Sequence, residues 1–248
     1  INSINWTRIM AQITYYIYAY NKVKKETGST NISFSVPTGN FGDAYAGYIA
    51  REKFNIPIKK LIVATNKNNI LDRFFRTGIY KKDKVFSTIT PSMDIQIASN
   101  FERLLYDITK EKGEKVSDFM NDFKEKGIII LEKKYFERTK ASFTSYCVNE
   151  LETKKRIAKT YDKFNMVIDP HTAVGLEASS KYLNEMPNDI VVTLATAHPS
   201  KFSDSVNHIL GFQPNLPTGY KNIFNSEEKC EVIDNSYNLV KKFILKNA

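Results

Sequence analysis

One short segment, Ser35 to Asp43 (SVPTGNFGD), concentrates the residue types that bind anions. Two glycines, Gly39 and Gly42, bracket a central pair between a β-prone run and a helix-forming stretch. At such a junction unpaired backbone N–H groups and the positive end of a helix dipole point at one place, and glycine lets an anion approach closely. The segment predicts a phosphate cup, although two glycines alone are more typical of an ordinary strand-to-helix turn.

The glycine spacing excludes two better-known phosphate loops. It lacks the G-x-G-x-x-G pattern of dinucleotide-binding folds, and no Gly-Lys-Ser/Thr follows as in a Walker loop. Asp43, at the helix start, suits the positive end of the helix dipole with or without a bound phosphate.

A second polar segment, Ile190 to Phe202 (IVVTLATAHPSKF), follows a predicted buried strand and carries Thr196 and His198. Ligands of open α/β sheets bind beyond the carboxyl ends of the strands, where Thr196 is expected. The alternatives are a threonine that caps a helix and a hydrogen-bonded structural histidine, which are the commoner roles of single residues of these types.

The segment Met166 to Gly175 (MVIDPHTAVG) repeats this arrangement with Asp169, His171 and Thr172, and the same alternatives apply. The histidines of the chain show no spacing typical of a metal site: His171, His198 and His208.

Strand-sized and helix-sized segments alternate around these loops. We predict strands at 32–36, 59–64, 166–169 and 190–195. We predict a first helix that ends before Gly28, and further helices at 44–54, 69–77, 149–163, 172–184, 200–210 and 236–246. This alternation predicts an α/β fold, a three-layer αβα arrangement with a mainly parallel sheet. The lysine- and glutamate-rich stretch at about 94–163 is interpreted as a helical insertion.

The first helix shows the clearest periodicity. Asn2 or Ser3 is expected to cap it, and its predicted apolar face consists of Trp6, Ile9, Met10, Ile13 and Ile17.

Composition restricts the class of protein. With 248 residues, 42% of them hydrophobic, the chain is long enough to bury a core. Its net charge of +9 comes from Lys and Arg scattered in ones and twos, which favours a solvated surface, or an anionic small substrate, over a nucleic-acid partner. Cys147 and Cys230 are expected to be reduced thiols.

No apolar run approaches the roughly 20 residues of a membrane-spanning helix, so we expect no membrane partner and a cytoplasmic protein. Because the chain starts without Met or a leader and enters a helix directly, we expect it to be a piece of a longer protein.

Taken together, the motifs resemble the threonine synthase family, a branch of the fold-type II pyridoxal-phosphate enzymes related to the tryptophan synthase β chain. The resemblance covers nearly the whole chain (1–248) in the expected order and rests on INSINWTRIMAQITYY, SVPTGNFGDAYAGYIA, LIVATNKNNILDRFFRTG, IDPHTAVG and LATAHPSKF. It implies the incomplete, C-terminal part of a catalytic domain. The implied reaction converts O-phospho-L-homoserine and water to L-threonine and phosphate, and a homodimer is common among related enzymes.

The resemblance also implies a cofactor site for pyridoxal 5'-phosphate (PLP). The residues expected to donate backbone N–H groups to its phosphate are Gly39, Asn40, Phe41, Gly42 and Asp43. Thr196 would hydrogen-bond the pyridine nitrogen and, unlike a carboxylate, leave that nitrogen neutral. Near LDRFFRTG, the cations Lys67, Arg73 and Arg76 are suggested as contacts for the anionic substrate.

One family feature has no match among the residues given. The Schiff-base lysine of the family lies upstream in a short Ser/Phe-Lys-Asp context, which none of the lysines here shares. The chain alone is therefore expected to be inactive. The alternatives are a lysine-less binding or pseudoenzyme module, another fold-type II enzyme acting on serine- or threonine-like substrates and, last, a basic nucleic-acid module.

Overall fold

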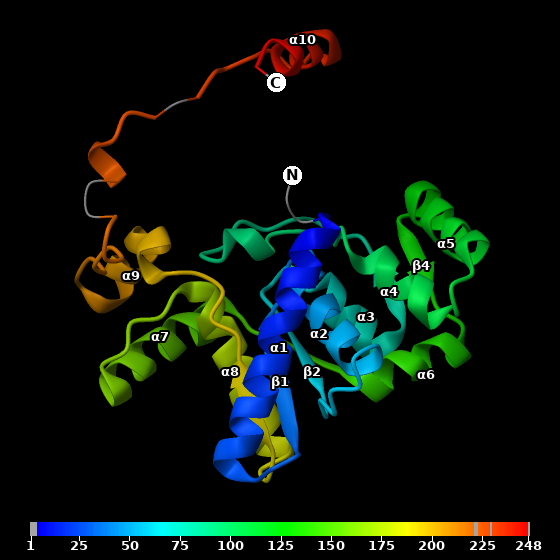
Figure 1. Ribbon diagram of the computed structural model, residues 1–248, viewed down its shortest axis with the longest axis horizontal. Coiled ribbons are helices and arrows are strands. Elements are labelled where there is room, and N and C mark those ends of the chain that lie inside the picture. The colour runs from blue at the N-terminus through cyan, green and yellow to red at the C-terminus, as the bar shows by residue number, and fades with distance from the viewer. Residues whose placement is uncertain (1–3, 221–222, 229, 248) are drawn as a thin grey trace. The chain divides into compact units, whose positions relative to one another are not determined.

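A parallel sheet of four strands, in the order β5-β2-β1-β6, forms the centre of the computed structural model (Figure 1). The strands are β1 (Ile32–Pro37), β2 (Leu61–Thr65), β5 (Phe143–Cys147) and β6 (Ile190–Thr193). The structure describes residues 4–220, 223–228 and 230–247. The chain divides into two units, Ile1–Pro214, which contains the sheet, and Asn215–Ala248.

Alternate side chains of the strands enter two separate cores, as the two-residue period of a strand requires. Leu61 and Val63 of β2 pack with α1 (Trp6–Thr27), α2 (Gly42–Glu52) and α3 (Ile70–Thr77). Ile62 and Ala64 pack on the opposite face with α8 (Pro170–Glu185), which α7 (Glu150–Phe164) covers. The prediction of a three-layer α/β fold with a parallel sheet is confirmed.

The first helix, α1, is capped by Asn5 at its N-terminus and by Gly28 at its C-terminus. Asn5 accepts a hydrogen bond from the Thr7 backbone N–H at 2.9 Å, and Gly28 ends the helix in the left-handed conformation with φ of 72°. The predicted N-caps, Asn2 and Ser3, lie outside the described residues.

The predicted apolar face of α1 is partly wrong. The buried stripe consists of Ile9, Ile13, Tyr16 and Tyr20, whereas the side chains of Trp6 and Met10 are exposed. The two tyrosines continue the four-and-three spacing of the isoleucines, so the buried face is rotated away from Trp6 and Met10.

The strand predicted at 166–169 is absent from the structure. These residues are an unpaired segment that leads into α8, and Asp169 is the N-cap of that helix. The strand that pairs with β1 at this edge of the sheet is β6, in which Val192 lies opposite Phe34 of β1.

The region predicted as a helical insertion, at about 94–163, contains strands as well as helices. Its helices are α4 (Phe101–Ile108), α5 (Gly113–Lys126), α6 (Lys133–Ser142) and the start of α7. The same region contains β5, which pairs with β2 in the main sheet, and β4 (Ile128–Ile130), which pairs antiparallel with β3 (Ile79–Lys81).

The second unit, Asn215–Ala248, contains the 3-10 turn η3 (Ile223–Asn225) and the helix α10 (Tyr237–Asn247). The helix predicted at 236–246 is confirmed by α10. Across the described part of the chain, no helix combines the length and apolarity needed to cross a membrane.

Candidate functional site

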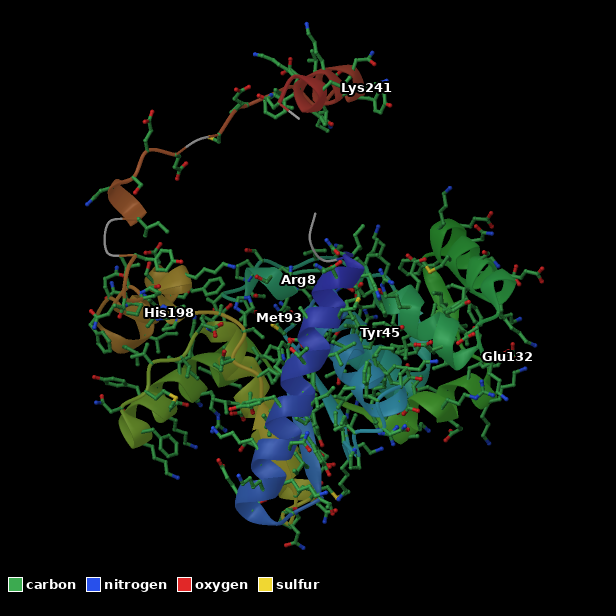
Figure 2. The ribbon with its side chains drawn as sticks, viewed as in Figure 1. Arg8, Tyr45, Met93, Glu132, His198 and Lys241 are labelled. Carbon is green, nitrogen blue, oxygen red and sulfur yellow. The ribbon has the colours of Figure 1, made fainter. Side chains whose placement is uncertain are left out.

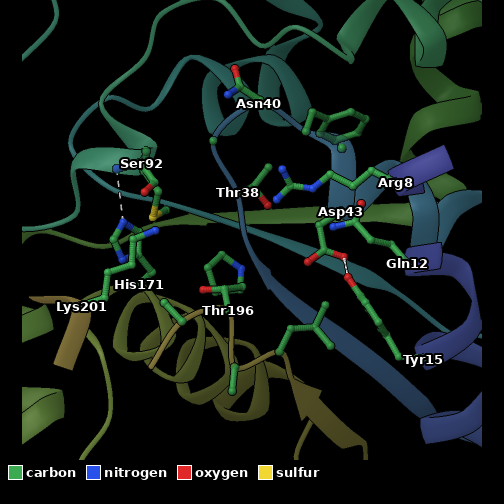
Figure 3. A pocket seen from close by; sticks show the side chains of 18 of the residues that line it. Arg8, Gln12, Tyr15, Thr38, Asn40, Asp43, Ser92, His171, Thr196 and Lys201 are labelled. Carbon is green, nitrogen blue, oxygen red and sulfur yellow. Dashed lines mark hydrogen bonds between the residues drawn. The ribbon is translucent and has the colours of Figure 1, made fainter. Parts of the chain in front are cut away.

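A cavity of about 600 Å³ opens in the first unit at the carboxyl ends of β1 and β6. Its walls are the loop 37–43 after β1, the loop 194–197 after β6, one face of α1, and the 3-10 turns η1 (Pro91–Met93) and η2 (Pro199–Phe202). Figure 3 shows Arg8 and Asp43 on one side of this space, and Ser92, His171 and Lys201 on the other. Parallel α/β sheets bind their ligands at this edge.

The N-terminus of α2 faces this cavity without a cap. Phe41 is the N-cap residue, and no side chain among the described residues hydrogen-bonds to the N–H groups of the first turn as a cap. Phe41 itself has the left-handed conformation, with φ of 66°. The first-turn N–H groups and the positive dipole end are thereby left for a ligand.

The unusual backbone at Phe41 is fixed by its ring. The ring is 1% exposed and packs against Phe75, Phe101 and Phe143, with centroid separations of 5.8, 6.3 and 5.7 Å. A left-handed phenylalanine costs of order 1–3 kcal/mol, and this aromatic cluster offsets that cost.

Neighbouring segments hold the two residues before Phe41. The backbone of Gly39 approaches Ser92 so closely that a Cβ atom there would lie 2.3 Å from the Ser92 carbonyl oxygen. The carbonyl of Asn40 accepts hydrogen bonds from the backbone N–H and the Nδ2 of Asn100, each at 3.1 Å. The loop is therefore shaped by η1 on one side and the start of α4 on the other.

Asp43, in the first turn of α2, is bonded to α1. Its Oδ1 accepts a hydrogen bond from the hydroxyl of Tyr15. The single hydroxyl hydrogen of Tyr16 is shared between Oδ1, at 3.0 Å, and the Asp43 carbonyl, at 2.9 Å. Burial raises the pKa of Asp43, and the two tyrosine hydrogen bonds offset only part of that rise.

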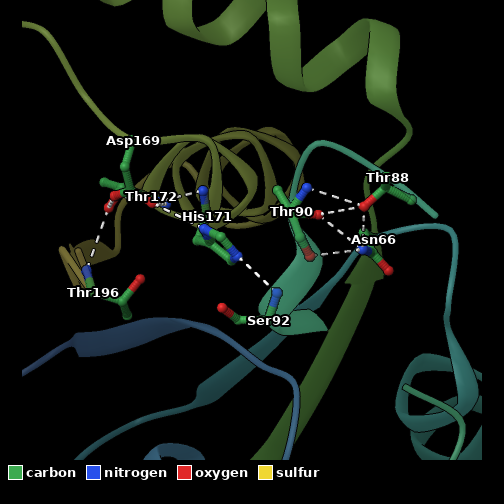
Figure 4. Close-up of polar contacts among 8 residues, drawn as sticks. All are labelled: Asn66, Thr88, Thr90, Ser92, Asp169, His171, Thr172 and Thr196. Atoms are coloured by element: carbon green, nitrogen blue, oxygen red, sulfur yellow. Dashed lines mark hydrogen bonds and ion pairs between the residues drawn. The ribbon is translucent and has the colours of Figure 1, made fainter. Parts of the chain in front are cut away.

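A buried polar chain supports the opposite wall (Figure 4). Asp169 accepts hydrogen bonds from the backbone N–H of His171 at 2.8 Å and from the hydroxyl of Thr172. His171 joins Asp169 through Nδ1 at 3.2 Å and accepts the Ser92 backbone N–H at Nε2, at 3.3 Å. The Thr196 backbone N–H donates to the Thr172 hydroxyl at 3.3 Å. Asp169 thus connects η1, α8 and the loop after β6.

The charge of Asp169 suits this role. Burial alone would raise its pKa, but the hydrogen bonds from His171 and Thr172 outweigh that effect and hold the pKa below its ordinary value. Asp169 is consequently ionised at neutral pH.

Two cations line the cavity, Arg8 of α1 and Lys201 of η2. Figure 2 labels Arg8 and Met93, which lie in the same part of the first unit and line the same cavity. The positive charges of Arg8 and Lys201, together with the open N-terminus of α2, favour an anionic ligand.

The structure brings all the predicted cofactor contacts to this one cavity: Gly39, Asn40, Phe41, Gly42, Asp43 and Thr196. The suggested substrate contacts do not line it. Lys67 lies 4.0 Å above the Phe86 ring, Arg73 donates to the Lys81 carbonyl at 2.9 Å, and Arg76 lies 3.8 Å from Asp72. Lys67 precedes α3, and Arg73 and Arg76 belong to that helix.

Several residues that line the cavity are not predicted by the sequence analysis. Arg8, Gln12 and Tyr15 form a stripe on α1 with spacings of four and three residues, a helical signal that the sequence does contain. Ser92 lies in the short 3-10 turn η1, and no periodic pattern in the sequence marks it. In the described part of the chain, no cluster of His, Cys, Asp and Glu suits a metal ion.

Comparisons with known proteins agree in pointing to one family. The family model described as "Threonine synthase, C-terminal" matches residues 172–244. The threonine synthase of Pseudomonas aeruginosa is 40% identical over 98% of this chain and 51% of its own length, and that of Saccharomyces cerevisiae is 39% identical over 94% and 50%. The crystal structure of PLP-bound threonine synthase from Brucella melitensis superposes with a TM-score of 0.88 at 36% identity, covering 98% of this chain and 52% of that one. The chain thus spans about half the length of the relatives it matches.

Proposed function

The chain belongs to the threonine synthase family, and on this premise we propose that it is the part of such an enzyme that binds the phosphate of PLP. The observation that carries the proposal is the convergence on one cavity of an uncapped helix N-terminus, a glycine fixed by close packing and the Thr196 loop. A phosphate fits this arrangement because each element either donates to an anion or makes room for one.

In this proposal the backbone N–H groups from Gly39 to Asp43 bind the phosphate. Thr196, whose backbone is held by Thr172 and whose side chain is exposed to the cavity, presents its hydroxyl to the pyridine nitrogen. PLP, when bound, supplies the electron-withdrawing ring that carbanion chemistry needs. The protein supplies the position and the electrostatic environment.

The proposed reaction is the conversion of O-phospho-L-homoserine and water to L-threonine and phosphate by a carbon–oxygen lyase. Arg8 and Lys201 support this substrate class, since positive side chains around a cavity attract an anionic substrate. We further propose a cytoplasmic enzyme that assembles as a homodimer and acts on this small molecule rather than on nucleic acid.

We also propose that the lysine that bonds PLP covalently lies outside residues 1–248. Among the described residues, Lys201 is the lysine that lines the cavity. Ser200 precedes it, as in the Ser/Phe-Lys-Asp context of the family, but Phe202 follows where that context has Asp. On this proposal the chain alone binds the cofactor phosphate but does not turn over substrate.

Titration with deoxypyridoxine phosphate tests the binding site. This analogue lacks the aldehyde of PLP, so surface lysines cannot bond it covalently. We expect saturable binding by calorimetry, and no binding of deoxypyridoxine, which lacks the phosphate. Equal binding of the two compounds, or binding of neither, would contradict the proposal.

Borohydride reduction after addition of PLP, followed by peptide mapping, tests the second point. Reduction traps any covalent bond between PLP and a lysine amine. We expect scattered, substoichiometric labelling and no phosphate release from phosphohomoserine by the chain alone. Stoichiometric labelling of Lys201 together with turnover would show that the chain carries its own catalytic lysine.

A further inference from the structure

The carboxyl group of Asp43 belongs to the same helix end that is proposed to bind phosphate. An acidic side chain in the first turn of a helix is attracted to the free N–H groups and the positive dipole end there. Left to itself, this carboxylate competes with a ligand phosphate for the same donors. Yet α2 has no side-chain cap among the described residues.

A second helix at the same cavity has its acid at the N-cap position itself, whereas Asp43 is the second residue of α2. Asp169 accepts the backbone N–H groups of His171 and Thr172 at 2.8 and 3.3 Å and so occupies the N-terminus of α8. That helix end is closed by its own acid, whereas the end of α2 remains open.

Two adjacent tyrosines of α1 bind the Asp43 carboxyl. Tyr15 and Tyr16 of α1 both direct their hydroxyls at Oδ1 of Asp43, and Tyr16 is fully buried. Figure 3 shows the Asp43 carboxyl joined to Tyr15, on the side of α1. Oδ1 accepts a hydrogen bond from Tyr15 and shares the hydroxyl hydrogen of Tyr16 with the Asp43 carbonyl, so the carboxyl has less to gain from the N–H groups of its own helix.

We propose that Tyr15 and Tyr16 are positioning residues that hold the Asp43 carboxyl against α1 and thereby keep the N-terminal N–H groups of α2 open for a ligand phosphate. This inference rests on the proposed function, because it concerns the same phosphate cup. It adds a role for the helix α1, whose tyrosines act on the cup through Asp43.

A purely structural role for the tyrosine pair makes a different prediction. If the hydroxyls only join α1 to α2, their removal disturbs the packing of the helices, and a change at Asp43 cannot repair it. If they restrain a competing carboxylate, removing that carboxylate restores the site. A double-mutant cycle separates the two roles.

The experiment uses the full chain and deoxypyridoxine phosphate at pH 8. The variants are Tyr15→Phe with Tyr16→Phe, and the same pair combined with Asp43→Asn. The matched control is Tyr20→Phe, because Tyr20 lies on the same face of α1, is 1% exposed and has a hydroxyl without a hydrogen-bond partner. Calorimetry measures the affinity, and thermal unfolding verifies that each variant is folded.

The tyrosine pair variant is expected to bind about tenfold more weakly, the effect of one competing capping side chain. Adding Asp43→Asn should restore most of this loss, and Tyr20→Phe should bind like the parent. Should the pair variant fail to fold, Tyr15→Phe with and without Asp43→Asn gives the same comparison at a partly exposed position.

Unchanged affinity in the tyrosine variants, or a loss that Asp43→Asn does not repair, would overturn the inference while leaving the proposed function intact. Failure of the parent chain to bind the analogue would overturn both.

Discussion

At the scale of single residues, the pKa values of Asp43 and Asp169 are shifted in opposite directions. Asp169 has a pKa below its ordinary value, since hydrogen bonds outweigh its burial, whereas burial raises the pKa of Asp43. A carboxyl with a lowered folded-state pKa stabilises the fold above its unfolded-state pKa of about 4, and this contribution is lost as the pH falls through the folded-state value. A raised pKa has the opposite sign: the ionised carboxyl destabilises the fold as the pH rises through that range.

Replacing each aspartate with asparagine is expected to reveal this contrast. Near pH 7, Asp169→Asn should lower the free energy of unfolding by about 1 kcal/mol, because asparagine can still cap the helix but replaces charge-assisted hydrogen bonds with weaker neutral ones. The loss should be smaller near pH 3, because the contribution of the ionised carboxyl decreases once the pH falls below the unfolded-state pKa. Asp43→Asn should cost less near pH 7 than near pH 3. Urea unfolding at the two pH values measures both, and equal pH dependence for the two variants would refute the assignment.

Gly39→Ala tests the close approach of the loop to η1. The new methyl group would meet the Ser92 carbonyl oxygen at 2.3 Å, so one of the two segments has to move. We expect a destabilisation of about 1–3 kcal/mol and weaker binding of deoxypyridoxine phosphate. Gly113→Ala is the control, because nothing lies within 4 Å of its Cβ position. A Gly39→Ala variant as stable as this control would contradict the packing described.

At the scale of elements, α8 reaches the sheet through Gly175. A Cβ atom there would lie 2.9 Å from side-chain carbons of both Pro37 and Thr193, which belong to β1 and β6. Gly175→Ala should therefore push α8 from the sheet and lower the free energy of unfolding by about 1–3 kcal/mol. Asn184→Ala, at an exposed position of the same helix, should have little effect in the same urea titration. Equal stability of the two variants would show that the helix adjusts freely.

Elements with local signals are predictable from the sequence. The helix at 69–77 is confirmed as α3 with Gly78 as its left-handed C-cap, and the strands at 32–36 and 59–64 are confirmed as β1 and β2. The errors at 166–169 and at Phe143–Cys147 concern membership of the sheet. That property depends on partners far away in the sequence, which no local pattern contains.

The candidate site likewise contains some residues that local motifs predict and some contacts that only the packing of distant elements creates. The loop 39–43 and Thr196 follow from local motifs and from the family resemblance, and the structure gathers them at one cavity. The tyrosine contacts of Asp43 join residues 28 and 27 positions apart and depend on the packing of α1 on α2. Lys67, Arg73 and Arg76 illustrate the converse, since proximity to a motif in sequence does not bring a side chain to its cavity.

At the scale of the whole molecule, the cavity described is built from residues of the unit Ile1–Pro214, as far as the described part of the chain extends. A chain that ends at Pro214 should therefore bind deoxypyridoxine phosphate within about twofold of the full chain, a difference well below 1 kcal/mol. Parallel calorimetric titrations of the two chains measure this. A tenfold loss on truncation would mean that Asn215–Ala248 contributes to the site.

The left-handed Phe41 has a consequence for the kinetics of ligand capture. Because its ring is locked among three other aromatic rings, the loop is already ordered before any ligand arrives. Binding then requires little loss of conformational entropy from the protein, and association need not wait for a slow rearrangement. The packing of Phe41 against Phe75, Phe101 and Phe143 in the hydrophobic core thus affects both the rate and the entropy of ligand binding at the polar cavity.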